Sequence, residues 1–273
     1  MQQSHVSLTG CSITTKVAMQ LLTRSEAAPP RHPRLTLGLA TSPAEVREVQ
    51  KLRHQLFIEA MGLSLPRLGS GLDHDEYDEV CEHLVVRDEL TCEVVGTYRV
   101  LGPSAARRIG AYYSEREFDL AELAELRPGM AEAGRACVHP DYRSGAVITL
   151  LWSGLAAFMA REKCRHLIGC ASISLADGGN NAAAVCQSLQ ASHLAPEGCR
   201  VTPRTPFDRM VTLPHQEPWV PPLIKGYLRG GAWVGGAPAL DLEFHTADLF
   251  MLLPLARLER RYARHYLRGE GAQ

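Results

Sequence analysis

The sequence has little lysine, no CxxC pair and no apolar run long enough to cross a bilayer. Its only lysines are Lys16, Lys51, Lys163 and Lys225, so arginine carries almost all of the basic charge. The formal net charge of -1 argues against a protein that binds nucleic acid. Without CxxC spacing, the eight cysteines argue against a structural zinc site, and we interpret them as reduced, buried thiols that hold no metal.

The rest of the composition is that of an ordinary globular protein, with 45% hydrophobic and 22% charged residues. The 273 residues can bury a full core as one large domain or two small ones, and we favour one. Residues 1–33 are polar and predict a flexible tail, which leaves a single domain over residues 34–268. The VAMQLL segment is too short for a secretory core, so we expect no signal peptide and a cytoplasmic protein.

The first predicted elements carry two candidate side chains. RLTLGLA alternates as a strand, and SPAE then opens a helix. Arg53 and Phe57 lie near the edge of the apolar face of this helix. A side chain at such an edge can reach a cleft.

An acidic loop and a predicted hairpin follow. The acidic residues of the loop are Asp73, Asp75, Glu76 and Asp78. A strand from about His83 to Arg87 then pairs with CEVVGTYRVL, which carries Arg99. The acidic cluster either holds a cationic substrate or forms a solvated loop.

The stretch Glu132–Leu155 predicts a strand, a polar turn and a long helix. Glu132 is a candidate base, but it and Arg135 would point to opposite faces of a regular strand. A shared role for these two residues therefore requires a bulge near Gly134. The turn exposes backbone amides at the start of the helix, which is typical of an anion site. The apolar face of the helix contains Ile148, Leu151, Trp152, Leu155 and Met159.

Two other chemistries have weak support. His83 and Asp88 have the H-x4-D spacing of glycerolipid acyltransferases, but they bracket a strand and would point to opposite faces. Cys137 and His139 suggest a thiol nucleophile, although the sequence supplies no obvious third member. We favour neither mechanism.

The remaining segments complete an alternating α/β pattern. One or two helices are predicted over residues 103–128, and another helix is predicted at NNAAAVCQSLQ. Strands are predicted at HLIGCASI, ALDLEF and DLFMLLPL. The proline-rich region 202–222 predicts a lid or wrap. A basic helix is predicted at the C-terminus, where its arginines either dock an acidic protein or anionic lipid or are solvated. Those arginines are Arg257, Arg261, Arg264 and Arg268.

Several of these blocks together resemble known families. The charged signature of autoinducer synthases is matched by Arg53, Phe57, Asp75, Asp78, Arg99, Glu132 and Arg135. CVHPDYRSGAVITLLWSGL, GCASI and DLEFHTADLFMLL are similar to the ornithine N-acyltransferases of bacterial ornithine-lipid synthesis. Both families are branches of the Gcn5-related N-acyltransferase superfamily, and the resemblance covers about Arg34 to Leu267.

This resemblance implies an α/β (α+β) fold with a mixed, mostly antiparallel central sheet, flanked by helices and splayed between its fourth and fifth strands. Those strands would be Glu132–Val138 and His166–Ile173, with the pantetheine arm of the acyl donor between them. The implied reaction moves a 3-hydroxy fatty acyl group from acyl carrier protein to the α-amine of L-ornithine, forming lyso-ornithine lipid. The expected partners are acyl carrier protein and L-ornithine, and no cofactor is expected.

The resemblance also implies roles for single residues. Glu132 and Arg135 would be catalytic. The substrate-binding residues would be Arg53, Phe57, Asp75, Asp78 and Arg99. Contacts with the carrier's phosphopantetheine would come from Cys137, Val138, Arg143 and Gly145. The usual RxxGxG/A loop lacks its second glycine here, which favours the single phosphate of a carrier protein over the pyrophosphate of CoA.

Three alternatives stay open from the sequence. The chain could be an autoinducer synthase, an N-acyltransferase for another amino acid, or a non-catalytic module that binds acyl carrier protein or an anionic membrane. The charged residues could also form one structural network beneath the site. Because the product would be an amphiphile, we expect peripheral contact with the anionic inner membrane.

Overall fold

The computed structural model describes residues 33–61, 71–209 and 217–258, with side chains 58–61 left out, and these residues belong to one compact unit that begins at Pro33. The expected N-terminal tail lies outside them and stays a prediction. The predicted C-terminal helix begins as the 3-10 helix η6 (Leu255–Arg257), and its remainder also lies outside the described residues. Arg257 packs over the ring of Trp233 and donates a hydrogen bond to the carbonyl of Gly231.

The first strands and the first long helix form where the sequence predicts them, and the acidic loop contains a short 3-10 helix that the sequence did not predict. These elements are β1 (Leu35–Leu39), α1 (Pro43–Met61), the 3-10 helix η2 (Glu76–Glu79), β2 (Glu82–Asp88) and β3 (Val94–Leu101). Ser42 and Glu45 cap α1 reciprocally, since the Ser42 Oγ accepts from the Glu45 amide at 3.3 Å and Glu45 Oε2 accepts from the Ser42 amide at 3.0 Å. β2 and β3 form the predicted antiparallel hairpin.

The region predicted as one or two helices is partly different. It contains α2 (Pro103–Ile109), η3 (Tyr113–Arg116), β4 (Phe118–Asp119) and η4 (Ala121–Gly129). Phe118–Asp119 is a short strand because it pairs with the distant β7 (Thr202–Pro203), and Asp119 then turns the chain by accepting from the Ala121 amide. Helical spacing alone could not show this long-range pairing.

The second half alternates strands and helices. It contains β5 (Met130–Val138), η5 (Pro140–Tyr142), α3 (Ala146–Arg161), β6 (His166–Ser174) and α4 (Asn180–His193). It ends with α5 (Pro222–Arg229), β8 (Trp233–Val234), β9 (Ala239–Asp241) and β10 (Thr246–Pro254). The sequence did not predict α5, which directly follows the proline-rich connection.

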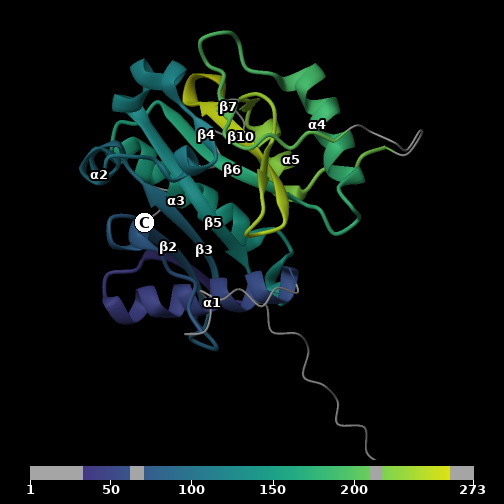
Figure 1. Cartoon of the computed structure of the whole chain (residues 1–273). Coiled ribbons are helices and arrows are strands. Elements are labelled where there is room, and N and C mark those ends of the chain that lie inside the picture. Colours follow the sequence, from purple (N-terminus) through teal and green to yellow (C-terminus); the bar gives the residue numbers. More distant parts are fainter. Residues whose placement is uncertain (1–32, 62–70, 210–216, 259–273) are drawn as a thin grey trace, which may run out of the picture. The chain divides into compact units, whose positions relative to one another are not determined.

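The main sheet has the strand order β1-β2-β3-β5-β6-β10-β8, with β9 paired to β10 (Figure 1). Every pair is antiparallel except β5 and β6, so the mixed, mostly antiparallel sheet is confirmed. β5 and β6 pair only over Met130–Glu132 and His166–Ile168, which confirms the predicted splay. Gly169 lies just beyond this pairing, where a Cβ atom would stand 2.3 Å from the carbonyl oxygen of Ala133.

The two faces of the sheet have different covers. One face packs against α3, α4 and α5 in the main core, which includes Tyr98 of β3 and Leu151 of α3. A second core lies on the other face around Tyr112, Phe118 and Phe250, beneath η3, β4 and η4. Because side chains alternate along a strand, Arg99 points away from the face of Tyr98. The charged residues of the candidate site therefore gather on the face with the second core.

A β-bulge brings Glu132 and Arg135 to this face together. The pairing of β3 with β5 shifts between Thr97, which faces Cys137, and Arg99, which faces Gly134. Arg135 lies inside the bulge with a φ of 55°, a left-handed conformation that is uncommon for a residue other than glycine. The bulge that a shared role requires is thus present beside Gly134.

Candidate active site

A cavity of about 220 Å³ lies where β5 and β6 part. Glu132 and Arg135 line it from β5, and Cys170 and Ser172 line it from β6. Phe57, Arg99 and Tyr113 complete one side. The cavity lies at the splay, which is the place that the sequence predicts for an acyl donor.

Glu132 is buried in the wall of this cavity and is fixed by the start of η3. Its Oε2 accepts from the Tyr113 amide at 2.6 Å, and its Oε1 accepts from the Ser114 amide at 2.8 Å and from the Ser114 hydroxyl. Burial raises the pKa of Glu132, although the hydrogen bonds from Ser114 and Tyr113 oppose this shift. A carboxylate with a raised pKa in an open cavity can accept a proton.

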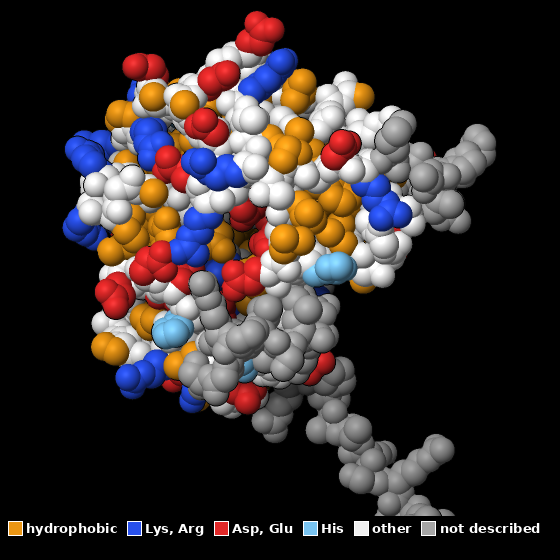
Figure 2. All heavy atoms as spheres, in the orientation of Figure 1, with side chains coloured by type: hydrophobic (Ala, Val, Ile, Leu, Met, Phe, Trp, Pro, Cys, Tyr) orange, Lys and Arg blue, Asp and Glu red, His pale blue; other side chains and the backbone are white. Residues whose placement is uncertain are grey.

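The aspartates of the acidic loop are ion-paired with arginines. Asp78 accepts from Arg53 at 2.7 Å and from Arg99 at 3.1 Å, and Asp75 accepts from Arg99 at 2.5 Å. Asp73 pairs with Arg53 at 2.7 Å. Figure 2 shows the same intermixing on the visible face, where acidic and basic side chains lie next to one another. The carboxylates and guanidinium groups form one balanced network.

Arg53 and Asp78 form the buried base of this network. The side chain of Arg53 is 0% exposed and does not line the cavity. Burial opposes the charge of Asp78, but the hydrogen bonds and charges of Arg53 and Arg99 outweigh it and hold the pKa of Asp78 well below its usual range. This geometry favours a structural role for both residues, and their predicted contact with substrate stays untested.

Arg135 is the arginine best placed to meet a ligand. It lines the cavity, and its ion pairs with Asp73 and Asp75 are long, at 3.3 and 3.4 Å. Its guanidinium group lies over the rings of Phe57 and Tyr113, with the Cζ atom 5.9 and 4.9 Å from the two ring centres. The ring of Phe57 therefore forms part of the cavity wall, and its position at the edge of the apolar face of α1 lets it reach the cavity.

The four residues predicted to contact the carrier lie together at the end of β5 and the start of α3. Gly145 is the residue before α3 and has a φ of 102°, which a residue with a Cβ rarely adopts. Arg143 is exposed and donates to the carbonyl of Val138 at 3.2 Å. Burial raises the pKa of Cys137 to about 12, so its thiol stays protonated and is a poor nucleophile.

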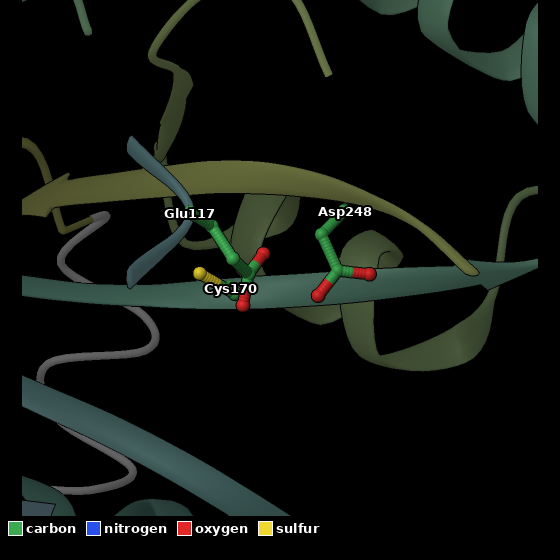
Figure 3. A group of neighbouring side chains, drawn as sticks. All are labelled: Glu117, Cys170 and Asp248. Atoms are coloured by element: carbon green, nitrogen blue, oxygen red, sulfur yellow. The ribbon is translucent and has the colours of Figure 1, made fainter. Parts of the chain in front are cut away.

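The structure adds two acidic residues that sequence reasoning missed. Glu117 precedes β4 and Asp248 lies on β10, and Figure 3 shows their carboxylates with Cys170 in one small space above β6. One carboxylate oxygen of Glu117, one of Asp248 and the Cys170 sulfur all lie within 4.8 Å of one another. The sequence contained a signal for Asp248, a charged residue directly before the apolar run LFMLLP of a buried strand, but none for Glu117.

This pair predicts an unusual dependence of stability on pH. Burial, and then the neighbouring charge of Asp248, raise the pKa of Glu117 above the ordinary value of 4.5. The folded state therefore holds a proton that the unfolded state releases, so the free energy of unfolding falls as pH rises from that ordinary value through the raised one. The slope is at most about 1.4 kcal/mol per pH unit for one proton.

Urea unfolding at a series of pH values should show this fall in the wild type and a flatter curve for Glu117→Gln. Glu89→Gln, which changes an exposed carboxylate in the turn after β2, is the matched control and should keep the wild-type slope. Equal slopes for wild type and Glu117→Gln would contradict the raised pKa.

The splayed sheet and its cavity define the chain as an N-acyltransferase with the Gcn5-related fold. Residues 52–153 match the family described as "Acetyltransferase (GNAT) domain". The chain is 34% identical over 249 residues to the L-ornithine N(alpha)-acyltransferase of Rhodobacter capsulatus, covering 85% of this chain and 94% of that protein. It is 32% identical over 259 residues to the Brucella abortus enzyme of the same name, covering 85% and 88%. The chain belongs to the L-ornithine N(alpha)-acyltransferase family.

Solved structures agree with this fold. The acyl-homoserine-lactone synthase LasI has a TM-score of 0.50 and 14% identity, covering 89% of this chain and 98% of LasI. FeeM, an N-acyl amino acid synthase from uncultured soil microbes, also has a TM-score of 0.50, with 12% identity and coverage of 82% and 93%. At these identities the likeness concerns the fold alone. In the described part of the chain, no helix combines the length and apolarity needed to cross a membrane.

Proposed function

We propose that this chain transfers a 3-hydroxy fatty acyl group from acyl carrier protein to the α-amine of L-ornithine, which forms lyso-ornithine lipid. The observation that supports it most is the buried Glu132 carboxylate in the cavity at the β5–β6 splay. The names of relatives that match most of the chain indicate the acceptor. The donor is inferred from the reduced loop before α3.

The chemistry requires a base because an α-amine is protonated in neutral water. Glu132, directly or through a water molecule, takes a proton from the ammonium group, and the free amine then attacks the thioester carbonyl carbon. A new C–N bond forms and the C–S bond breaks. The nitrogen loses a second proton as the amide forms, and this proton balances the carrier's thiolate, which leaves as a thiol. In this proposal the guanidinium group of Arg135 orients the α-carboxylate of the amino acid.

The carrier's phosphate is proposed to lie at the start of α3. Gly145 lets the chain turn sharply there, and the exposed Arg143 stands beside the free amides of the first helical turn. A single phosphate needs fewer donors than a pyrophosphate, which fits the missing second glycine. The exposed guanidinium group of Arg143 also suits the acidic surface of a carrier protein.

Lipid mass spectrometry tests this proposal directly. A host without ornithine lipids should accumulate an amide-linked 3-hydroxyacyl ornithine when it expresses this chain, and nothing of that mass when it expresses Glu132→Gln. The purified protein should prefer the acyl carrier protein thioester to the CoA thioester of the same chain length. Acyl-homoserine lactones in place of the lipid would contradict the proposal and support an autoinducer synthase.

A further inference from the structure

The cavity and the charged network beside it contain carboxylates of two kinds. The aspartates of the acidic loop, Asp73, Asp75 and Asp78, are all ion-paired with arginines. By contrast, no ion pair formed among the described residues includes Glu117, Asp241 or Asp248, although all three line the same cavity. This part of the cavity can therefore accept a positive charge from a bound ligand.

In this part of the cavity, one carboxylate oxygen has no hydrogen-bond donor among the described residues. Asp248 is only 4% exposed, and its carboxylate accepts from the hydroxyls of Thr246 at 2.7 Å and Ser172 at 3.2 Å. The Oε2 atom of Glu117 is buried and accepts no hydrogen bond from the described residues. Two carboxylates this close cannot both be ionised unless a positive charge or a shared proton lies with them. A cation with N–H donors would satisfy both groups.

We propose that Glu117 and Asp248 bind the side-chain ammonium group of a diamino-acid substrate whose α-amine faces Glu132. This inference rests on the proposed function and names the part of the site that selects ornithine. Asp241, which lines the same cavity, adds negative charge nearby. The pair recognises the side chain and takes no part in the bond-forming step.

A chain of short contacts links Glu132 to the acidic pair. Ser114 donates its hydroxyl to Glu132, and the Cys170 sulfur lies 3.5 Å from that hydroxyl and beside the acidic pair. Glu132 and the pair are therefore separated by little more than two small side chains. An amino acid with a short chain of methylene groups can span this gap.

This site also explains how a neutral amino acid is rejected. When an ammonium group binds, it replaces the proton that the carboxylates otherwise share, and that proton leaves to solvent. A side chain without the terminal amine leaves the buried carboxylates without a cation, and sites with unpaired buried polar groups discriminate by about 10⁴-fold. Selection of ornithine thus follows from charge rather than from shape.

The test compares L-ornithine with L-norvaline, which has the same carbon skeleton without the terminal amine. With acyl carrier protein thioester as donor, the wild type should show a kcat/KM for ornithine at least about 10²-fold above that for norvaline. Glu117→Gln and Asp248→Asn should lose most of this preference through a higher KM for ornithine, with norvaline unchanged or improved. Glu89→Gln is the matched control and should keep the wild-type preference.

The outcomes separate the two proposals. A wild type that acylates neither amino acid overturns the proposed function, whereas one that acylates both equally overturns only this inference. Folded variants that lose both activities in equal proportion, or keep the preference, also overturn it. A stoichiometric divalent metal that copurifies with the wild type and is absent from Glu117→Gln would assign the pair to that metal instead.

A second measurement needs no variant. Calorimetric titration of the wild type with ornithine, in buffers of different ionisation enthalpy, should reveal release of a proton that norvaline does not cause. Equal proton release with both amino acids would overturn the inference even if neither variant folds.

Discussion

Glutamine at position 132 is expected to lower kcat of acyl transfer by about 10²–10⁴-fold, the usual contribution of a positioned general base. The amide has nearly the shape of the carboxylate but cannot take a proton from the substrate ammonium. KM for the amino acid should change little, because Arg135 is proposed to hold the α-carboxylate. Steady-state kinetics with saturating acyl carrier protein thioester measures both constants.

The pH dependence of the same reaction gives an independent check. Because burial raises the pKa of Glu132 above the ordinary 4.5, the base is ionised only above that raised value, and kcat should rise with pH through it. In Glu132→Gln this acidic limb should disappear. The limb should lie at higher pH than it would for an exposed glutamate.

The control for this variant must separate catalysis from folding. Glu132 accepts two backbone N–H groups, and the glutamine amide can satisfy only one of them, so Glu132→Gln loses some stability. Ser114→Ala removes the hydroxyl donor to Glu132 but keeps the carboxylate, and it should retain the acidic limb. A folded Glu132→Gln protein with full activity would show that the carboxylate only fixes η3.

Asparagine at position 78 is expected to destabilise the fold by about 3–5 kcal/mol, the cost of removing one partner from a buried ion pair. Arg53 is fully buried, so the change leaves its guanidinium group with less negative charge and no route to water. The lowered pKa of Asp78 likewise means that its ionised carboxylate stabilises the folded state. Its contribution is present above the ordinary value of 3.8 and is lost as pH falls through the lower folded value.

Glu76→Gln is the matched control for Asp78→Asn. Glu76 lies in the same short helix, but its ion pair with Arg116 has side chains that are 63% and 37% exposed. An exposed pair contributes less than about 1 kcal/mol, so this variant should unfold close to the wild type in urea. If Asp78→Asn instead unfolds like the wild type and raises KM for ornithine, the acidic loop is a substrate site rather than a structural network.

The expected results for Glu132→Gln and Asp78→Asn divide the charged residues into a structural group and a group in the cavity. Those of the acidic loop and their arginines hold α1, η2 and β3 together beneath the site. Glu132 and Arg135 lie above them in the cavity, where a substrate can reach both. Under the proposed mechanism, the signature that resembles autoinducer synthases is thus partly catalytic and partly structural.

The sequence by itself determined the elements that depend on local interactions. The capping pair at Ser42 and Glu45 defined the start of α1, alternation defined the hairpin of β2 and β3, and the apolar runs defined β6 and β10. It also placed Glu132 and Arg135 close in the chain and identified the bulge that they would need. These features depend on neighbours within a few residues, which a sequence displays.

Only the tertiary structure decided which charges neutralise one another. Arg53 meets Asp78 through packing of α1 against the acidic loop. Glu117 meets Asp248 because the adjacent Phe118 packs against Phe250 of β10, and because the register of β10 on β6 turns Asp248 to that face. A shift of that register by one residue would turn Asp248 to the other face of the sheet. Contacts between distant segments depend on such registers and on a bulge at one residue, and no local pattern in the chain encodes them.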